Sequence, residues 1–192
     1  MTNEPTDTGD HDLLKRALGG DEASFTTLYR RRQGSVYRFA LQMSGSPSLA
    51  EEVTQEVFLT VIRDAGRFDP ERGSLLAYLY GIARNHVLRG LQRERSHVHL
   101  DDEQDCDGSP WTAREDILGE LTRGETIESV RRAVLALPAS FREVVVLCDL
   151  HEMSYVEAAA VLGCVVGTVR SRLHRARGML LEKLKATKRA FV

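Results

Sequence analysis

Apolar side chains in this chain recur every three or four residues, the spacing that places them on one face of an α-helix. No stretch sustains the two-residue alternation and hairpin turns that predict β-strands, and Pro and Gly gather where the helical pattern breaks. We therefore expect an all-α fold. The expected helices cover residues 11–18, 22–44, 48–64, 74–94, 124–136, 139–150, 155–162 and 167–186.

The helical pattern fails between residues 96 and 123, where an acidic segment contains a Gly-Ser-Pro break at 108–110. From Asp101 to Glu128, ten acidic residues stand against two arginines, which gives a net charge of −8. Such a composition is typical of a connector rather than of a packed core. We expect two small helical domains, residues 1–95 and 124–192, joined by a flexible acidic linker over residues 96–123.

The composition limits the classes of function. Of the residues, 42% are apolar, no apolar run approaches the roughly 20 residues of a membrane span, and the acidic N-terminus is unlike a signal peptide. We expect a cytoplasmic protein without membrane insertion. Cys106, Cys148 and Cys164 lie far apart, which predicts reduced thiols and no metal site. The sequence has no Gly-rich phosphate loop or nucleophile-base motif, so we expect no enzyme activity and no cofactor.

The helix expected from Ser48 has two contrasting faces. Ser48 and Glu51 fit a capping box, in which the two side chains bond free amides of the first helical turn. An apolar stripe follows on one face, formed by Leu49, Val53, Val57 and Val61. The opposite face carries an apolar side chain among polar ones, and its residues are Glu52, Gln55, Glu56 and Leu59. This face is either a solvated surface or a surface for a partner.

The helix expected from residue 74 follows a Pro- and Gly-containing loop, and Ser74 is placed to cap it. His86 is expected to project into the core. An aromatic ring, an amide and a guanidinium share the outer face at Tyr78, Asn85 and Arg89, and Arg84, Arg93 and Arg95 add positive charge nearby. Rings stack on unpaired bases and guanidiniums bind phosphates, so this face suits single-stranded DNA. A merely soluble amphipathic helix would show the same pattern.

The third feature is a helix-turn-helix unit. Ser154 and Glu157 form a capping box, and Gly163 supplies the turn before a basic helix. From Val165 to Val192, eight basic residues face one glutamate, a net charge of +7 that favours a phosphate-rich partner. An apolar stripe on that helix leaves Ser171, His174 and Arg175 facing outward, with Thr168, Arg170, Arg172 and Arg177 on the flanks. We expect this helix to enter the major groove, with the flanking arginines on phosphates.

These segments resemble the extracytoplasmic-function group of the bacterial sigma-70 family. Similarity to the family's sigma-2 domain lies in residues 25–29, 50–58 and 78–85, and similarity to its sigma-4 domain in residues 137–138, 154–155 and 167–177. The motifs occur in the family's order. The resemblance therefore implies a specificity subunit of RNA polymerase that recognises promoter DNA.

The resemblance also implies roles for individual residues. The face of Glu52, Gln55, Glu56 and Leu59 would dock the coiled coil of the β′ subunit, and the core polymerase would also offer its β flap. The minus-ten element would be melted and held by Phe68, Arg72, Ser74, Tyr78, Asn85 and Arg89. The minus-35 element would be read by Thr168, Arg170, Ser171, Arg172, His174 and Arg175. An anti-sigma factor that clamps both domains is a further implied partner.

The acidic linker would have to bridge the two promoter elements. Elements about 17 base pairs apart span about 58 Å of duplex. A relaxed coil of about 28 residues averages about 30 Å end to end, while its extended length is about 90 Å. We therefore expect a stretched linker, which would thread the basic RNA exit path of the polymerase.

A different class of function remains open on the residues alone. The chain could be a helix-turn-helix transcriptional regulator whose N-terminal half is a sensory domain. Such a regulator would need a ligand pocket or receiver chemistry in its first half. The aromatic and basic face at residues 78–95 favours a second DNA-binding domain instead.

Overall fold

A computed structural model describes residues 9–64, 68–98 and 119–190. These residues are almost entirely helical, which confirms the all-α prediction. The elements are α1 (Asp10–Leu18), α2 (Glu22–Ser44), α3 (Pro47–Arg63), η2 (Pro70–Arg72), α4 (Leu75–Val98), α5 (Gly119–Leu135), α6 (Ala139–Val145), η3 (Val146–Leu150), α7 (Tyr155–Leu162) and α8 (Val166–Ala190). Helices α2 and α7 have the bounds that the sequence predicts, and the π-helical turn η3 continues α6 directly.

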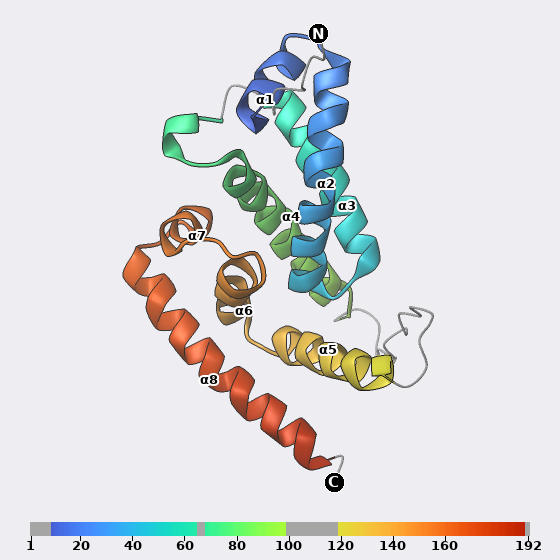
Figure 1. Ribbon diagram of the computed structural model, residues 1–192, viewed down its shortest axis with the longest axis vertical. Coiled ribbons are helices and arrows are strands. Elements are labelled where there is room, and N and C mark those ends of the chain that lie inside the picture. Colours follow the sequence, from blue (N-terminus) through green and yellow to red (C-terminus); the bar gives the residue numbers. More distant parts are fainter. Residues whose placement is uncertain (1–8, 65–67, 99–118, 191–192) are drawn as a thin grey trace.

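The N-terminal helical group consists of α1 to α4 (Figure 1). Its core is formed by fully buried side chains of α2, α3 and α4, among them Val36, Val57 and Leu79. The predicted apolar stripe of α3, from Leu49 to Val61, is buried as expected. Helices α3 and α4 approach so closely at Gly90 that a Cβ atom there would lie 2.6 Å from a methyl carbon of Leu49. A side chain at this crossing would require the methyl groups of Leu49 to move.

The start of α3 differs from the prediction. The N-cap is Ser46, whose hydroxyl accepts a hydrogen bond from the amide of Leu49 at 3.3 Å, and Pro47 occupies the first helical position. Ser48 therefore lies inside the first turn and is not the cap. The reason is the proline: its ring fixes φ near the helical value and it lacks the amide hydrogen that this position leaves unbonded.

The C-terminal helical group consists of α5 to α8 (Figure 1). Its core includes Val144, Val169 and Leu173. Helix α7 begins with the predicted capping box, since the Ser154 hydroxyl accepts from the Glu157 amide and the Glu157 carboxylate accepts from the Ser154 amide. Gly163 ends α7 with φ 63°, a left-handed conformation that glycine adopts without strain. The chain then turns directly into α8, which completes the helix-turn-helix.

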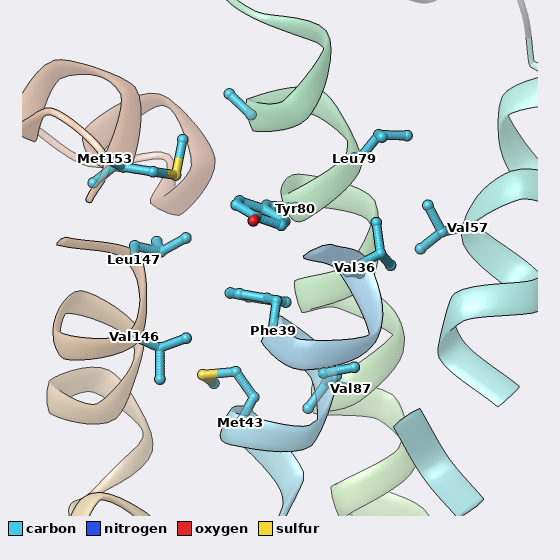
Figure 2. Close-up of a cluster of buried hydrophobic side chains, with 14 of the residues drawn as sticks. Val36, Phe39, Met43, Val57, Leu79, Tyr80, Val87, Val146, Leu147 and Met153 are labelled. Carbon is cyan, nitrogen blue, oxygen red and sulfur yellow. The ribbon is translucent and has the colours of Figure 1, made fainter. Parts of the chain in front are cut away.

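The two helical groups pack against each other over one continuous core. Figure 2 shows Phe39, Met43 and Tyr80 of the N-terminal group facing Val146, Leu147 and Met153 of the C-terminal group. The sequence did not predict this contact. Helix α4 extends to Val98 and α5 begins at Gly119, so both run into the range expected as linker, and the rest of that range, residues 99–118, lies outside the described residues.

Candidate nucleic-acid interface

The outer face of α8 is presented as the sequence predicts. Val169, Leu173 and Ala176 are at most 2% exposed and anchor the helix on its inner side. The side chains of Ser171, His174 and Arg175 project from the opposite side and are exposed, as is Arg170, while Thr168 and Arg172 are half-buried. The helix therefore presents a short polar and basic surface that can hydrogen-bond base edges and phosphates.

Local contacts hold some of these groups in place. The Arg170 guanidinium carbon lies 5.8 Å from the ring centroid of Tyr155, a cation-π contact that orients the arginine against α7. The Ser171 hydroxyl donates to the Thr168 carbonyl at 3.1 Å. Arg177 donates to both carboxylate oxygens of Asp149, at 3.1 and 2.5 Å. The guanidinium therefore has a carboxylate partner in this arrangement, and its expected role as a phosphate contact stays a prediction.

The outer face of α4 begins at an aromatic contact. The Tyr78 ring, which is half-buried, lies 5.5 Å from the ring of Phe68. Phe68 is also 5.9 Å from the imidazole of His11, a residue of α1 that the sequence did not single out. Asn85 and Arg89 follow on the helix and are exposed. The face thus offers one partly covered ring, an amide and a guanidinium in a row.

The loop before α4 supplies the remaining residues expected at the minus-ten element. The Ser74 hydroxyl accepts from the Ala77 amide at 3.2 Å and so begins the helix as predicted. The same hydroxyl donates to the Glu157 carboxylate of α7 at 3.4 Å. The side chain of Arg72 lies outside the described residues. The end of this loop is therefore in contact with the helix-turn-helix unit.

Two of the arginines expected to add positive charge beside α4 have carboxylate partners. Arg84 donates to Glu143 of α6 at 2.7 Å, and Arg93 donates to Glu52 of α3 at 3.3 Å. The side chain of Arg95 lies outside the described residues. Carboxylates of neighbouring helices therefore offset the charges of Arg84 and Arg93 in this arrangement. Helical periodicity could not reveal either partner, since each lies on another helix.

The polar face of α3 is exposed as a potential partner surface. Glu52 and Gln55 are exposed, Glu56 is half-buried, and Leu59 is 48% exposed. Ile62, one turn further on, is 49% exposed and enlarges the apolar part of this face. Arg63 lies 3.5 Å from Glu56, a weak surface ion pair. The sequence pointed to Leu59 but not to Ile62, although the spacing of three residues places both on one side of the helix.

A hollow of about 350 Å³ lies between α2 and α3 beside this face. Gln55 and Glu51 contribute its α3 side. The α2 side is lined by Tyr29, Arg30, Gln33, Gly34 and Tyr37, of which only Tyr29 lies in a segment that the sequence singled out. A partner that docks on the α3 face would also meet these α2 side chains.

His86 was expected in the core, but it is only half-buried, on the side of α4 that faces α3. Partial burial lowers the pKa of its imidazole, while the nearby Glu56 carboxylate acts in the opposite direction. Cys148 and Cys164 are free and half-buried, and burial raises the pKa of the Cys148 thiol, which keeps it protonated. Cys106 lies outside the described residues.

His, Cys, Asp and Glu side chains in the described part of the chain form no group of three that could hold a metal ion. Within residues 9–64, 68–98 and 119–190, every helix is too short or too polar to cross a membrane.

Comparison with known protein families gives two matches in sequence order. Residues 28–97 match sigma-70 region 2, and residues 127–180 match sigma-70 region 4. The first region covers most of α2 to α4, and the second contains the helix-turn-helix and most of α8. The residues of α4 and α8 expected to contact DNA therefore fall inside the matched regions.

Similar curated proteins include two ECF RNA polymerase sigma factors. The ECF RNA polymerase sigma factor SigE of Mycolicibacterium smegmatis is 35% identical over 189 residues, covering 95% of this chain and 69% of the relative. The ECF RNA polymerase sigma factor EcfG of Rhodopseudomonas palustris is 34% identical over 146 residues, covering 76% of this chain and 77% of the relative.

Two solved structures share the arrangement of helices. The sigma factor RpoE in complex with the anti-sigma factor NepR from Bartonella quintana superimposes with a TM-score of 0.69 at 26% identity, covering 84% of this chain and 96% of that one. CnrH in complex with the cytosolic domain of CnrY gives a TM-score of 0.68 at 29% identity, covering 93% of this chain and 99% of that one.

Proposed function

This chain belongs to the extracytoplasmic-function group of the sigma-70 family of RNA polymerase sigma factors, and we propose which of its surfaces bind promoter DNA and which bind the core polymerase. A sigma factor directs the core polymerase to promoters and takes part in opening the DNA. The alternative of a regulator with an N-terminal sensory domain is thereby excluded, because residues 28–97 match sigma-70 region 2. The protein acts in the cytoplasm and catalyses no reaction itself.

The C-terminal helical group reads the minus-35 element through α8. The observation that carries this assignment is the exposure of Ser171, His174 and Arg175 opposite a fully buried stripe. Arg175 and Ser171 contact base edges, and Arg172 is better placed for phosphates at the edge of the groove. Thr168 and Arg170 complete the contact surface near the start of the helix. The domain that performs this step comprises residues 124–192.

The N-terminal helical group, residues 1–95, holds the melted minus-ten element. Tyr78 stacks on an unpaired base, Asn85 hydrogen-bonds a base edge and Arg89 binds the backbone. The loop that precedes α4 contributes Phe68, Arg72 and Ser74. Support comes from the ring contact between Phe68 and Tyr78, which places the loop and the helix side by side.

The exposed face of α3 binds the core polymerase at the β′ coiled coil, through Glu52, Gln55, Glu56 and Leu59. Exposed apolar side chains beside carboxylates suit an interface with an apolar centre and a charged rim. The C-terminal helical group meets the β flap, and the acidic segment between the groups threads the RNA exit path.

Run-off transcription with core polymerase on the chain's own upstream region tests the function as a whole. We expect a discrete transcript that depends on the chain, with permanganate-reactive thymines around the start site. Core polymerase alone is the control. Tight, sequence-specific duplex binding by the isolated chain, with no effect of core polymerase on binding or opening, would instead identify a conventional DNA-binding regulator.

An anti-sigma factor regulates the chain. Support comes from the RpoE structure, which contains the anti-sigma factor NepR. A purified candidate regulator should abolish run-off transcription when it is added before the core polymerase. It should have little effect once the open complex has formed, and inhibition that is independent of the order of addition would argue against capture of the free sigma factor.

A further inference from the structure

A third aromatic ring lies beside the two that we assign to the minus-ten element. We propose that His11, in the first turn of α1, binds an unpaired base of the melted strand that neighbours the base stacked on Tyr78. The inference rests on the proposed sigma-factor function. It adds a contact from a helix that precedes the family match over residues 28–97.

The three rings form a row that joins three segments of the chain. The ring centroid of Phe68, in the loop before α4, lies 5.9 Å from that of His11 and 5.5 Å from that of Tyr78. The ring planes are inclined by 52° and 47°, so the rings do not cover one another face to face. Phe68 and Tyr78 are half-buried, whereas His11 is exposed. His11 is therefore the ring of this row that a ligand reaches most easily.

Helix α1 holds His11 in this place through its own contacts with the N-terminal group. Its buried apolar side chains, among them Leu14 at 3% exposed, anchor the helix in the core. Asp10, the residue before His11, forms ion pairs with Arg31, at 3.1 Å, and with Arg32 of α2. The backbone is thus fixed on both sides of His11, and a preformed ring loses little conformational freedom when a ligand binds.

The charges around the row favour a base over a phosphate. Asp12, Asp69 and Glu71 are exposed and stand within three residues of His11 or Phe68 in the chain. These carboxylates repel the negatively charged backbone of DNA, whereas a base carries no charge and stacks on any aromatic ring. The ligand that suits the row is therefore an unpaired base, and the contact with the DNA backbone falls to α4.

The order of the rings assigns separate bases to the two ends of the row. Phe68 lies between His11 and Tyr78, so one base cannot stack on both of the outer rings. Bases within a duplex are stacked on one another and become available only when the strands are separated. His11 therefore contributes to holding the melted strand and not to binding the duplex.

Abasic scanning of a promoter with a preformed bubble tests this contact, with the full-length chain bound to core polymerase. His11→Ala should weaken binding to the bubble promoter about fivefold or more, the lower end for stacking on one base. An abasic site is then placed at each position of the melted strand in turn. At one position wild type and His11→Ala should bind equally, because the base that His11 contacts is already missing. A constant difference at every position would overturn the contact.

Two further variants separate stacking from a change in local structure. His11→Phe keeps an aromatic ring and should retain most of the affinity for the bubble promoter. Asp12→Asn alters the exposed neighbour of His11 without removing a ring, and it should bind at least as tightly as the wild type. Circular dichroism checks that each variant is folded. Binding by His11→Phe that is as weak as binding by His11→Ala would show that stacking is not the contact.

Tyr78→Ala in the same scan distinguishes the His11 contact from the proposed function. Its loss of affinity should disappear at a different abasic position from that of His11→Ala. The same position for both variants would mean that His11 acts through Phe68 and not on a base of its own, which overturns the contact. If Tyr78→Ala weakens binding and His11→Ala does not, the His11 contact alone fails. If the wild-type complex does not bind the bubble promoter, the proposed function fails as well.

Discussion

The hydroxyl of Tyr80 lies 2.7 Å from Nδ1 of His151, although the two residues are 71 positions apart in the chain. Burial raises the pKa of Tyr80 to about 12, so the phenol stays protonated. Its hydroxyl donates a hydrogen bond to Nδ1 of His151. The other ring nitrogen, Nε2, then carries the imidazole hydrogen and donates to Gln42 Oε1 at 2.8 Å. The neutral imidazole is therefore the form that this site between the helical groups accommodates.

The stability of the folded chain should fall in mild acid because of His151. Burial, with a smaller effect of the Arg38 guanidinium, lowers the pKa of His151 from 6.5 to about 4. The unfolded chain therefore binds a proton at a higher pH than the folded chain does. The stability that the neutral ring contributes is fully present above about pH 6.5 and is lost as the pH falls toward 4. Thermal melting at a series of pH values across this window measures the effect.

The control for this prediction is His86, whose pKa is also lowered by burial. His151→Gln should flatten the pH dependence of the melting temperature over the window, while His86→Gln should leave most of it in place. An unchanged slope in His151→Gln would show that other groups cause the acid sensitivity.

The cap of α3 can be tested with two neighbouring serines. Ser46→Ala should lower stability by about 1 kcal/mol, because the Leu49 amide loses its acceptor. This corresponds to a drop of roughly 2–4 °C in melting temperature for a chain of this size. Ser48→Ala, inside the first turn, should change stability by less than about 0.5 kcal/mol. The opposite order would restore Ser48 as the cap.

Reversal of the α3 face should abolish polymerase binding. Glu56→Arg combined with Leu59→Asp reverses one charge in the proposed interface and replaces an apolar side chain with a carboxylate. Such changes weaken binding between complementary surfaces. We expect loss of co-purification with core polymerase and an unchanged circular dichroism spectrum.

A matched control for that variant lies on the first two helices, where Leu18 is 42% exposed and Glu22 is exposed. Glu22→Arg with Leu18→Asp makes the same chemical changes away from α3 and should leave polymerase binding intact. If both double variants still bind the polymerase, the α3 face is an ordinary solvated surface and not the polymerase interface.

Arg175→Ala should weaken minus-35 recognition by roughly 1–3 kcal/mol and relax the preference at one base position. The reason is the loss of a guanidinium that bonds a base edge. Arg172→Ala should instead reduce affinity evenly across sequences, because a phosphate contact carries no sequence information. Binding of the polymerase complex to a library of minus-35 variants distinguishes the two, and identical base preferences in both variants would contradict the assignment.

Tyr78→Ala should impair DNA opening and leave minus-35 binding intact, since stacking on an unpaired base contributes about 1–3 kcal/mol. Permanganate reactivity reports the defect, and a promoter with a preformed bubble should partly rescue it. Tyr78→Phe keeps the ring and should behave like the wild type. Equal rescue of Arg175→Ala by the bubble would mean that the two residues do not divide the work as proposed.

The sequence by itself determined where the helices form and which segments resemble sigma-70 regions 2 and 4. The bounds of α2 and α7 follow from local signals: Asp21 accepts two amide hydrogen bonds at the start of α2, and Ser154, Glu157 and Gly163 delimit α7. Outward faces on α3, α4 and α8 follow equally from periodicity. These features depend on residues within a few positions of one another, so a reading of the chain can find them.

Tertiary structure alone decided how those faces are used. In the sequence Arg84 has no evident partner, whereas the fold pairs it with Glu143, 59 positions away. Likewise, no local pattern links His151 to Tyr80. Apolar side chains on α2 and η3 could each have been buried within their own group. Periodicity identifies the apolar face of a helix but not the helix that packs against that face. The hydrophobic effect has no directional preference, and a partner distant in the sequence leaves no local signal.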